Sequence, residues 1–291
     1  MMQIAFLTCL DQPELRVRKH IFPLLKKAGV EVQEIPWQHA IPQNLKHLDA
    51  ILLNQAWDYH LPENIERFYQ LLNELDEAQA KVLNPLSIIR ANLNKRYLVD
   101  LQKTGVPVIP TTAISDADEF SESLITDWAK VILKPSVSAN AFSIVGPLER
   151  YEVKDNMLQM LKRIPEGADL LIQRFIPEIK QGELALLFFN GKFSHAALKR
   201  PGEGSIILED GLDLYASVSP ALVSIAENAL HQFLSINGFS PNEALYARVD
   251  GIETSEGFVI MEVELLEPDL YLWHNEGDCE AFVSALLEQL S

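Results

Sequence analysis

The sequence predicts an α/β fold of the α+β type. An N-terminal βαβ lobe with an open parallel sheet is expected to precede two lobes with antiparallel sheets. Strand-like and helix-like segments alternate over the first 84 of the 291 residues, as in a βαβ unit. Further along the chain, Asn190-Gly191 separates two alternating strands, which is a strong short signal for a hairpin. A second antiparallel pair is expected at 244–252 and 257–268.

The βαβ lobe is expected to occupy residues 1–84. The first expected helix closes at Gly29, a residue that favours the position just after a helix end. The lobe contains no GxGxxG, so a dinucleotide site is not indicated. The strands are expected at 3–8, 30–35, 49–54 and 81–84, and the helices at 13–29 and 62–78.

Two further segments, 85–180 and 181–291, are expected to form the antiparallel lobes. Residues 85–104 are expected to be helical, and 106–112, which carries two prolines, is expected to connect domains. The other expected strands lie at 129–136 and 168–179 and in the hairpin 183–201, and the other helices at 149–161, 219–236 and 277–290.

Composition and charge exclude several classes of protein. The net charge is −17, from 24 basic and 41 acidic residues, which argues against a nucleic-acid surface because such a surface needs a basic stripe. No apolar run reaches membrane-spanning length, and the N-terminus has no basic region typical of a signal peptide. Cys9 and Cys279 show neither metal-ligand spacing nor a disulfide framework. We therefore expect a cytoplasmic protein that does not act on membranes.

The segment IMEVELLEP (260–268) places carboxylates in an otherwise apolar strand. Glu262 and Glu264 share one face because strand side chains alternate, and Asp250 ends the neighbouring strand. Carboxylates this close repel one another unless a positive charge separates them or one is protonated. Three converging carboxylates suit Mg²⁺, which usually also binds substrate phosphates. The alternative is that they are merely solvated or salt-bridged, which is the commoner fate of acidic residues on a sheet.

Cations elsewhere favour the magnesium interpretation. Lys134 ends the strand VILKP, where it can reach a phosphate in a cleft; the alternative is a solvated lysine at a strand end. Lys95-Arg96 opens a helix, and Lys199-Arg200 ends the hairpin. Arg248 faces the same side of its strand as Asp250, where it can stabilise transferred charge or form a salt bridge to Glu262 or Glu264. In QRFIPE (173–178) the strand breaks at a proline, which would leave backbone groups free for an adenine edge.

In their order, these parts resemble the ATP-grasp superfamily of carboxylate–amine ligases over about residues 80–275. The resemblance implies that two antiparallel sheets enclose ATP. It assigns catalytic roles to Arg248, Lys199 and Arg200, and the metal ligands to Asp250, Glu262 and Glu264. Its implied ATP-binding residues are Lys95, Lys134, Ser136, the hinge residues Gln173, Phe175, Ile176 and Glu178, and Glu183.

Within that superfamily the chain is similar to the subgroup of the ATP-dependent cyclo-ligase that forms D-cycloserine. The shared segments include WDYH (57–60), NPLSIIR (84–90), KPSVSA (134–139) and MEVELLEPDLYL (261–272). Glu264 stands where the superfamily usually has Asn, as it does in this subgroup. The loop after Lys134 has no glycine, so Ser136, Ser138 and Asn140 are expected to supply hydrogen bonds to phosphate. Two roles are open for the segment Trp57, Asp58, Tyr59 and His60. It is expected either to line the acceptor side of the cleft or only to pack the loop at the end of a strand.

The resemblance implies a ligase that uses ATP and Mg²⁺ and acts on a small amino-acid-like substrate. A substrate carboxylate would be activated as an acyl phosphate and captured by an amine. Two alternatives stay open: a ligase of the same fold that modifies a peptide or protein, and a nucleotide-binding protein without catalysis. A homodimer is common in the superfamily and is expected on that ground alone.

Overall fold

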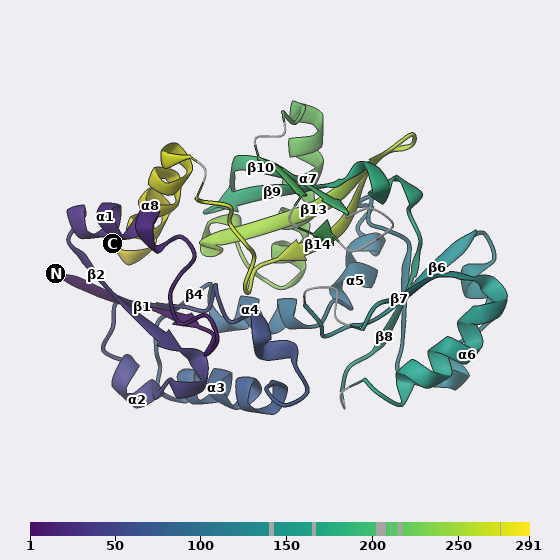
Figure 1. Cartoon of the computed structure of the whole chain (residues 1–291), viewed down its shortest axis with the longest axis horizontal. Coiled ribbons are helices and arrows are strands. Elements are labelled where there is room, and N and C mark those ends of the chain that lie inside the picture. The colour runs from purple at the N-terminus through teal and green to yellow at the C-terminus, as the bar shows by residue number, and fades with distance from the viewer. Residues whose placement is uncertain (140–142, 165–166, 202–207, 210, 215–216, 274) are drawn as a thin grey trace.

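Three β-sheets organise the chain in a computed structural model (Figure 1). The structure describes residues 1–139, 143–164, 167–201, 208–209, 211–214, 217–273 and 275–291. The N-terminal sheet lies at one end of the molecule and the sheet formed by residues 111–174 at the other, with the largest sheet between them. No helix among the described residues has the length and apolar character needed to cross a membrane.

The N-terminal lobe is an open parallel sheet in the order β2-β1-β3-β4, as predicted. Its first helix begins at Arg18 rather than at residue 13, because Cys9–Val17 forms turns before the chain becomes helical. The elements of this lobe are β1 (Met2–Thr8), α1 (Arg18–Lys27), β2 (Val30–Pro36), α2 (Pro42–Leu45), β3 (Ala50–Leu52), α3 (Ile65–Glu77) and β4 (Val82–Leu83). Short 3₁₀ turns at Trp37–His39 and Trp57–His60 follow β2 and β3.

Two helices, rather than one continuous stretch, follow the first lobe. α4 (Leu86–Leu93) and α5 (Tyr97–Lys103) are separated at Asn94, which has extended backbone angles. This break lies at Lys95, whose backbone N–H donates to the carbonyl of Ser136 at 2.8 Å. The break therefore attaches the helix pair to the end of the next sheet.

The second sheet is antiparallel, in the order β5-β8-β6-β7. Residues 111–114 pair with β8 as an edge strand, although 111 and 112 were expected to belong to the connection 106–112, and β7 was not predicted at all. The elements are β5 (Thr111–Ile114), β6 (Lys130–Pro135), β7 (Val145–Glu149), α6 (Arg150–Leu161) and β8 (Leu170–Arg174), with 3₁₀ turns at Ala117–Glu119 and Glu122–Ile125. α6 covers this sheet through a cluster that includes Val153 and Met157.

The third sheet is antiparallel, in the order β11-β10-β9-β13-β14, and β12 also pairs with β10. The predicted hairpin is confirmed: Asn190 and Gly191 both have positive φ, of 47° and 74°, as a two-residue type I′ turn requires. The elements are β9 (Glu183–Phe189), β10 (Lys192–Pro201), β11 (Leu208–Glu209), β12 (Gly211–Leu214), α7 (Pro220–Ile236), β13 (Tyr246–Thr254), β14 (Gly257–Glu264) and α8 (Glu276–Leu290). Short 3₁₀ turns at Pro177–Gln181 and Pro241–Glu243 complete the chain.

The two faces of the third sheet have different partners. One face packs on α7 and α5 through a cluster that includes Leu186, Phe188 and Phe233. On the opposite face, Leu187 and Phe189 pack with Phe282 of α8, which itself lies beside α1 (Figure 1). The C-terminal helix therefore joins the last lobe to the first and leaves part of this second face for charged residues.

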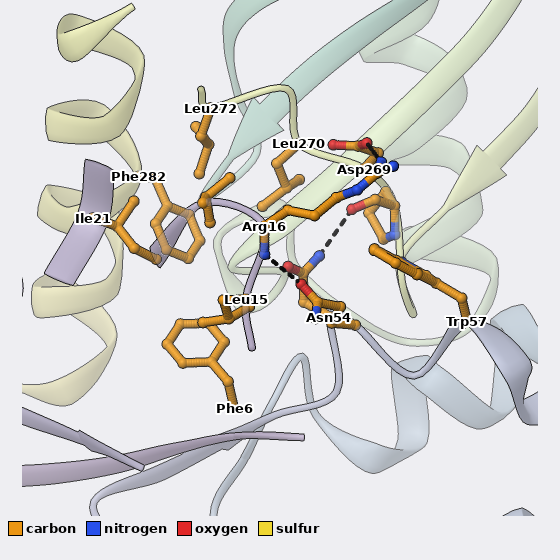
Figure 2. A pocket seen from close by; sticks show the side chains of 13 residues that line it. Phe6, Leu15, Arg16, Ile21, Asn54, Trp57, Asp269, Leu270, Leu272 and Phe282 are labelled. Atoms are coloured by element: carbon orange, nitrogen blue, oxygen red, sulfur yellow. Dashed lines mark hydrogen bonds and ion pairs between the residues drawn. The ribbon is translucent and has the colours of Figure 1, made fainter. Parts of the chain in front are cut away.

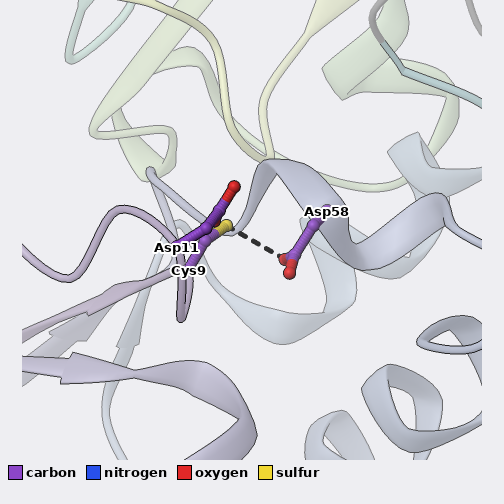
Figure 3. Close-up of side chains that lie close together, drawn as sticks. All are labelled: Cys9, Asp11 and Asp58. Atoms are coloured by element: carbon purple, nitrogen blue, oxygen red, sulfur yellow. Dashed lines mark hydrogen bonds between the residues drawn. The ribbon is translucent and has the colours of Figure 1, made fainter.

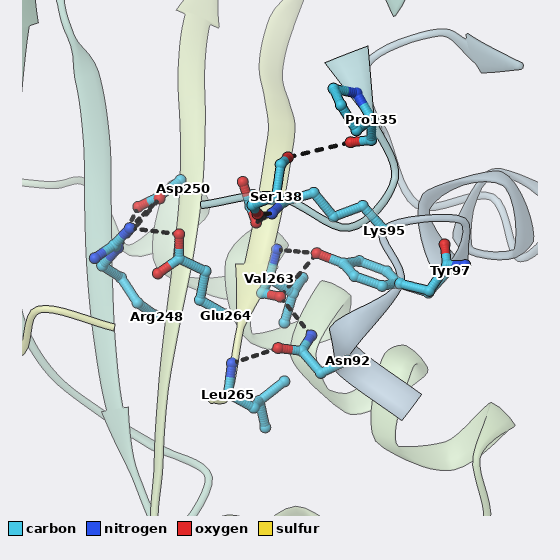
Figure 4. A network of polar contacts seen from close by, with 12 residues as sticks. Asn92, Lys95, Tyr97, Pro135, Ser138, Arg248, Asp250, Val263, Glu264 and Leu265 are labelled. Atoms are coloured by element: carbon cyan, nitrogen blue, oxygen red, sulfur yellow. Dashed lines mark hydrogen bonds and ion pairs between the residues drawn. The ribbon is translucent and has the colours of Figure 1, made fainter. Parts of the chain in front are cut away.

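Side chains from the first half of the chain bind the edge strand β14. Asn92 Oδ1 accepts from the Leu265 N–H and its Nδ2 donates to the Val263 carbonyl, while the Tyr97 hydroxyl bonds both backbone groups of Val263 (Figure 4). Asn84 donates to the carbonyls of Leu265 and Tyr246 at 2.6 and 2.8 Å. These amides satisfy an edge that would otherwise present unpaired groups.

We predict that Asn84→Ala destabilises the protein by about 2–4 kcal/mol, because Asn84 is fully buried and its loss leaves two carbonyls without donors. Asn237→Ala is the matched control, since the Asn237 side chain makes one local bond, to Phe233 O, at the end of α7. Urea denaturation of both variants checks the prediction. Equal losses in the two variants would contradict the role given to Asn84.

Candidate active site

Charged residues gather on the open part of the third sheet's second face. The register pairs Arg248 with Glu264, Asp250 with Glu262, and Lys199 with Glu183. Directly paired residues of antiparallel strands share a face, so all six side chains lie on one side of the sheet. The sequence prediction that Glu262 and Glu264 share a face with Arg248 and Asp250 is therefore confirmed.

Cations separate the carboxylates on this face (Figure 4). Arg248 contacts Asp250 at 2.9 Å and Glu264 at 2.7 Å, and Lys95 contacts Glu262 at 3.0 Å. Lys199 lies 2.5 Å from Glu183 and 2.9 Å from Asp250. The salt bridge considered for Arg248, to Glu262 or to Glu264, forms with Glu264, whereas Glu262 is paired with Lys95.

The pKa values follow from burial and these pairs. Burial would lower the pKa of Lys199 and of Lys95, but the neighbouring carboxylates outweigh it and raise both. Burial raises the pKa of Glu264 to about 7, with the repulsion of Glu262 and Asp250 adding to it against the attraction of Arg248. Burial would also raise the pKa of Asp250, but the positive charges of Arg248 and Lys199 outweigh this effect and lower the pKa.

Lys134 faces this charged surface from the second sheet. Its side chain is buried, and no carboxylate of the described residues lies within ion-pair distance of it. Burial lowers the pKa of Lys134, with Lys95 adding to it, although Glu262 and Glu183 raise it. A buried ammonium group without a salt bridge is costly, so it favours an anionic ligand between the two sheets.

The hinge segment connects the second sheet to the third. Gln173 is buried and its amide donates to Thr111 Oγ1 at 2.9 Å. Backbone groups of this segment were expected to be free, but the Phe175 N–H is bonded, since it donates to the Lys130 carbonyl at 2.9 Å. Among the described residues, neither the Phe175 carbonyl nor the Ile176 N–H has a hydrogen-bond partner, so these two groups retain the predicted capacity to bind an adenine edge. Glu178 lies partly exposed on the following 3₁₀ turn.

Three other predicted contacts are not favoured by the geometry. Ser136 is fully buried and its hydroxyl accepts from the Asp169 N–H, while Ser138 donates to the Pro135 carbonyl. Arg200 is exposed and follows Lys199 by one residue, so it belongs to the other face of the strand. Asn140 lies outside the described residues.

The segment WDYH reaches the same region from the first lobe. His60 Nδ1 bonds the Trp57 carbonyl, and burial, with Lys95 nearby, lowers the pKa of His60. Tyr59 is buried, and its pKa is raised well above the usual value by burial and by Glu267, Glu262 and Glu264. Sequence reasoning gave Glu267 no role, although burial and Glu264 raise the pKa of this carboxyl strongly.

A different trio is the most compact set of metal-ligand types. In the described ranges, atoms of Cys9, Asp11 and Asp58 lie within 4.8 Å of one another, whereas Asp250, Glu262 and Glu264 form no such group (Figure 3). Burial raises the pKa of the Cys9 thiol, which donates to Asp58 at 3.0 Å. Asp58 also accepts from Trp37 and Gln38, both at 2.6 Å, so protein donors already satisfy it. Cys9 and Asp58 therefore belong to a hydrogen-bonded structural cluster, and Asp11 lies close to them.

We predict that Lys95→Met costs about 2–4 kcal/mol, because it leaves the partly buried Glu262 without its cation. Adding Glu262→Gln should recover most of this loss, since the uncompensated charge is removed. Urea denaturation of the wild type, both single variants and the double variant gives the coupling energy. Additive losses would show that the pair contributes no coupling.

Comparison with known proteins finds a family match for each of two segments of the chain. Residues 4–84 match the N-terminal domain of D-cycloserine synthetase DcsG, and residues 97–207 match the ATP-grasp domain of prokaryotic glutathione synthetase. The chain is 24% identical to the cycloserine biosynthesis protein DcsG of Streptomyces lavendulae, over 96% of this chain and 97% of that one. It is 25% identical to a glutathione synthetase of Neisseria meningitidis serogroup A, over 54% of this chain and 47% of the relative.

Solved structures agree on the fold. The crystal structure of D-cycloserine synthetase DcsG superposes with a TM-score of 0.84 at 22% identity and covers 99% of this chain and 100% of that one. A D-alanine–D-alanine ligase from Bacillus anthracis complexed with ATP superposes with a TM-score of 0.70 at 14% identity, over 100% of this chain and 97% of the other. The chain therefore joins an N-terminal domain of the D-cycloserine synthetase type to an ATP-grasp domain.

Proposed function

We propose that the protein is an ATP-dependent carboxylate–amine ligase that acts on small amino-acid-like substrates. One observation carries the proposal: a sheet face with Arg248, Asp250, Glu262 and Glu264 lies opposite the buried Lys134, which forms no ion pair within the described part of the chain. Phosphoryl transfer needs such an arrangement, because its catalysis consists mainly of positioning and of neutralising developing charge. The matches to the ATP-grasp domain and to D-cycloserine synthetase support it.

The carboxylate set fits divalent metal ions in its chemistry. Asp250, Glu262 and Glu264 offer hard oxygen atoms from neighbouring positions of two paired strands. Each of these carboxylates forms an ion pair with an ammonium or guanidinium group, so each already has a positive charge beside it. Bound Mg²⁺ would neutralise charge on the phosphates; one similar ligase has been solved with Mg and ADP.

This chain's own residues would bind and orient the substrates. Lys134 and Lys95 would contact the phosphates, and the Ile176 N–H and Phe175 carbonyl the adenine edge. Arg248 and Lys199 would stabilise negative charge while a substrate carboxylate takes up the γ-phosphoryl group of ATP and ADP leaves. They would do so again while an amine attacks the acyl carbon and displaces inorganic phosphate. Because Cys9 and Cys279 are both buried and are not joined to each other in a disulfide, we also infer a reducing cytoplasm. The expected homodimer stays a prediction.

The test of this function is ATP-dependent phosphate release in the presence of single amino acids and pairs of them, with products identified by mass spectrometry. We expect release only with Mg²⁺ and with a substrate that carries a carboxylate, together with a product that has lost the elements of water. Glu264→Ala should lower this turnover at least 100-fold. Nucleotide binding without turnover on any substrate would favour the non-catalytic alternative.

Lys134→Met should weaken binding of the unhydrolysable analogue AMP-PNP at least tenfold, because the variant removes a buried cation that forms no ion pair with any described carboxylate. Lys130→Met is the matched control: Lys130 lies at the start of the same strand, is exposed and pairs with Glu149 at 3.1 Å. Isothermal titration calorimetry measures both variants. Unchanged affinity in Lys134→Met would remove this residue from the nucleotide site.

Mg²⁺ affinity of the nucleotide complex should rise about tenfold from pH 6 to pH 8. The pKa of Glu264 is raised to about 7, so its carboxyl is mostly protonated at pH 6, and a metal must displace that proton. Titration of Mg²⁺ at several pH values checks this. Glu264→Gln should bind Mg²⁺ more weakly and show a flatter pH profile, and an unchanged profile in this variant would contradict the assignment.

A further inference from the structure

The chain crosses the charged sheet face directly after β14. It leaves this strand at Glu264, and the carbonyl of Leu270 is 3.0 Å from Nε2 of His195 on β10. Two strands, β13 and β9, lie between β14 and β10, so this short stretch crosses three strand spacings, which is about 14 Å. We call residues 265–272 the crossing segment.

His195 lies on the same face of the third sheet as the ion pairs. The register pairs Leu187 with His195 on one side and with Arg248 on the other, and Arg248 in turn with Glu264. Residues paired in this way share a face, so these side chains form one row across four strands. His195 ends the row beside Asp278 of α8, away from the charged group. A residue outside that group therefore bonds the segment that crosses it.

The hydrogen bonds of His195 determine which ring nitrogen carries the proton. A carbonyl oxygen can only accept, so Nε2 donates to Leu270, and Nδ1 accepts from the Ser194 hydroxyl at 2.9 Å. Asp278 Oδ1 is 3.7 Å from Nδ1, beyond hydrogen-bond distance. Burial lowers the pKa of His195, although Asp278 raises it, so the ring is neutral at pH 7. Protonation would add a proton at Nδ1 and leave the Nε2 donor in place.

Other contacts fix the middle of the crossing segment to the first lobe. The Pro268 carbonyl accepts from Asn54 at 2.9 Å, and Asp269 lies 3.1 Å from Arg16 (Figure 2). Both contacts come before the residue whose carbonyl His195 binds. They therefore join the segment to the first lobe, whereas His195 joins it to β10.

The residue after Leu270 packs on the charged group. Tyr271 has φ of 50°, which a tyrosine adopts only where its surroundings fix it, and its N–H donates to Asp269 at 3.0 Å. The centre of its ring lies 6.0 Å from the guanidinium carbon of Arg248. Burial raises the pKa of Tyr271 to about 12, although Arg248 and Lys199 lower it, so its hydroxyl stays protonated beside these cations. The buried ring limits the directions in which Arg248 can turn.

We propose that His195 is a positioning residue for phosphoryl transfer: its bond to the Leu270 carbonyl keeps Tyr271 packed on Arg248 and so directs the guanidinium at the transferred group. The inference rests on the proposed function and adds to it a residue that lies outside the charged group. If His195 only satisfied a buried carbonyl, its substitution would change the free energy of unfolding and leave turnover by the folded protein unchanged.

Two substitutions separate the Nε2 donor from the rest of the ring. In His195→Gln the side-chain amide reaches the position of Nε2 and can donate to Leu270, whereas in His195→Asn the shorter amide reaches only the position of Nδ1. Phosphate release with Mg²⁺ and the active substrate is measured for both. We expect His195→Asn to lower kcat about tenfold with little change in the KM for ATP, because Arg248 acts on charge that develops during transfer. His195→Gln should keep about half of the wild-type kcat.

A double variant tests whether His195 acts through Tyr271. Tyr271→Ala removes the ring from Arg248 and should also lower kcat. If His195 acts through this ring, adding His195→Asn to Tyr271→Ala lowers kcat little further. His231→Asn is the matched control, because His231 lies on α7, which packs on the opposite face of the same sheet, and it should keep the wild-type kcat.

Hydrogen exchange of the crossing segment, measured by mass spectrometry, tests the bond without any substrate. Exchange should be about tenfold faster in His195→Asn and unchanged in His195→Gln and His231→Asn. The inference is overturned if exchange stays at the wild-type rate in His195→Asn, if both His195 substitutions lower kcat equally, or if the losses in the double variant add.

Should His195→Asn unfold, which exchange throughout the chain would show, His195→Gln decides, since a tenfold loss of kcat in this folded variant overturns the inference. A wild type that releases no phosphate overturns the proposed function and the inference together. Release that does not depend on His195 overturns the inference alone.

Discussion

The structure depends on the electrostatic compensation of carboxylates that share one buried sheet face. Glu183, Asp250, Glu262 and Glu264 would repel one another there, and each is paired with Lys199, Arg248 or Lys95. Such ion pairs add little to the free energy of unfolding, because the cost of desolvating two ions offsets much of their attraction. The arrangement is instead suited to a function in which anionic and cationic ligands exchange with the paired side chains.

The cations come from different parts of the chain, so the site requires several elements to be correctly placed. Arg248 and Lys199 lie on the sheet itself, whereas Lys95 lies in the break between α4 and α5. Asn92 and Tyr97, on either side of that break, bind the backbone of β14 and hold Lys95 beside Glu262. The hydrogen bonds that satisfy the sheet edge thus also position a charge at the site.

Much of the site could be predicted because alternation in a strand fixes which residues share a face. Arg248 and Asp250, or Glu262 and Glu264, are two residues apart, and the turn at Asn190-Gly191 sets the hairpin that pairs Lys199 with Glu183. What could not be predicted depends on contacts between distant segments. Arg16 and Asp269 are 253 residues apart, and Asn84 reaches Tyr246 and Leu265. The strand β7 was missed because Gly146 and Pro147 are typical of a turn. Backbone groups of the hinge were expected to be free, but the Phe175 N–H donates to the Lys130 carbonyl across the sheet.

The most direct test of the account is a crystal structure of the protein with Mg²⁺ and AMP-PNP. We predict a triphosphate between the second and third sheets, in contact with Lys134. We also predict Mg²⁺ on oxygens of Asp250, Glu262 and Glu264, with Lys95 and Arg248 turned from Glu262 and Glu264 toward the phosphates. A triphosphate bound elsewhere, with the ion pairs of the sheet face intact, would contradict it.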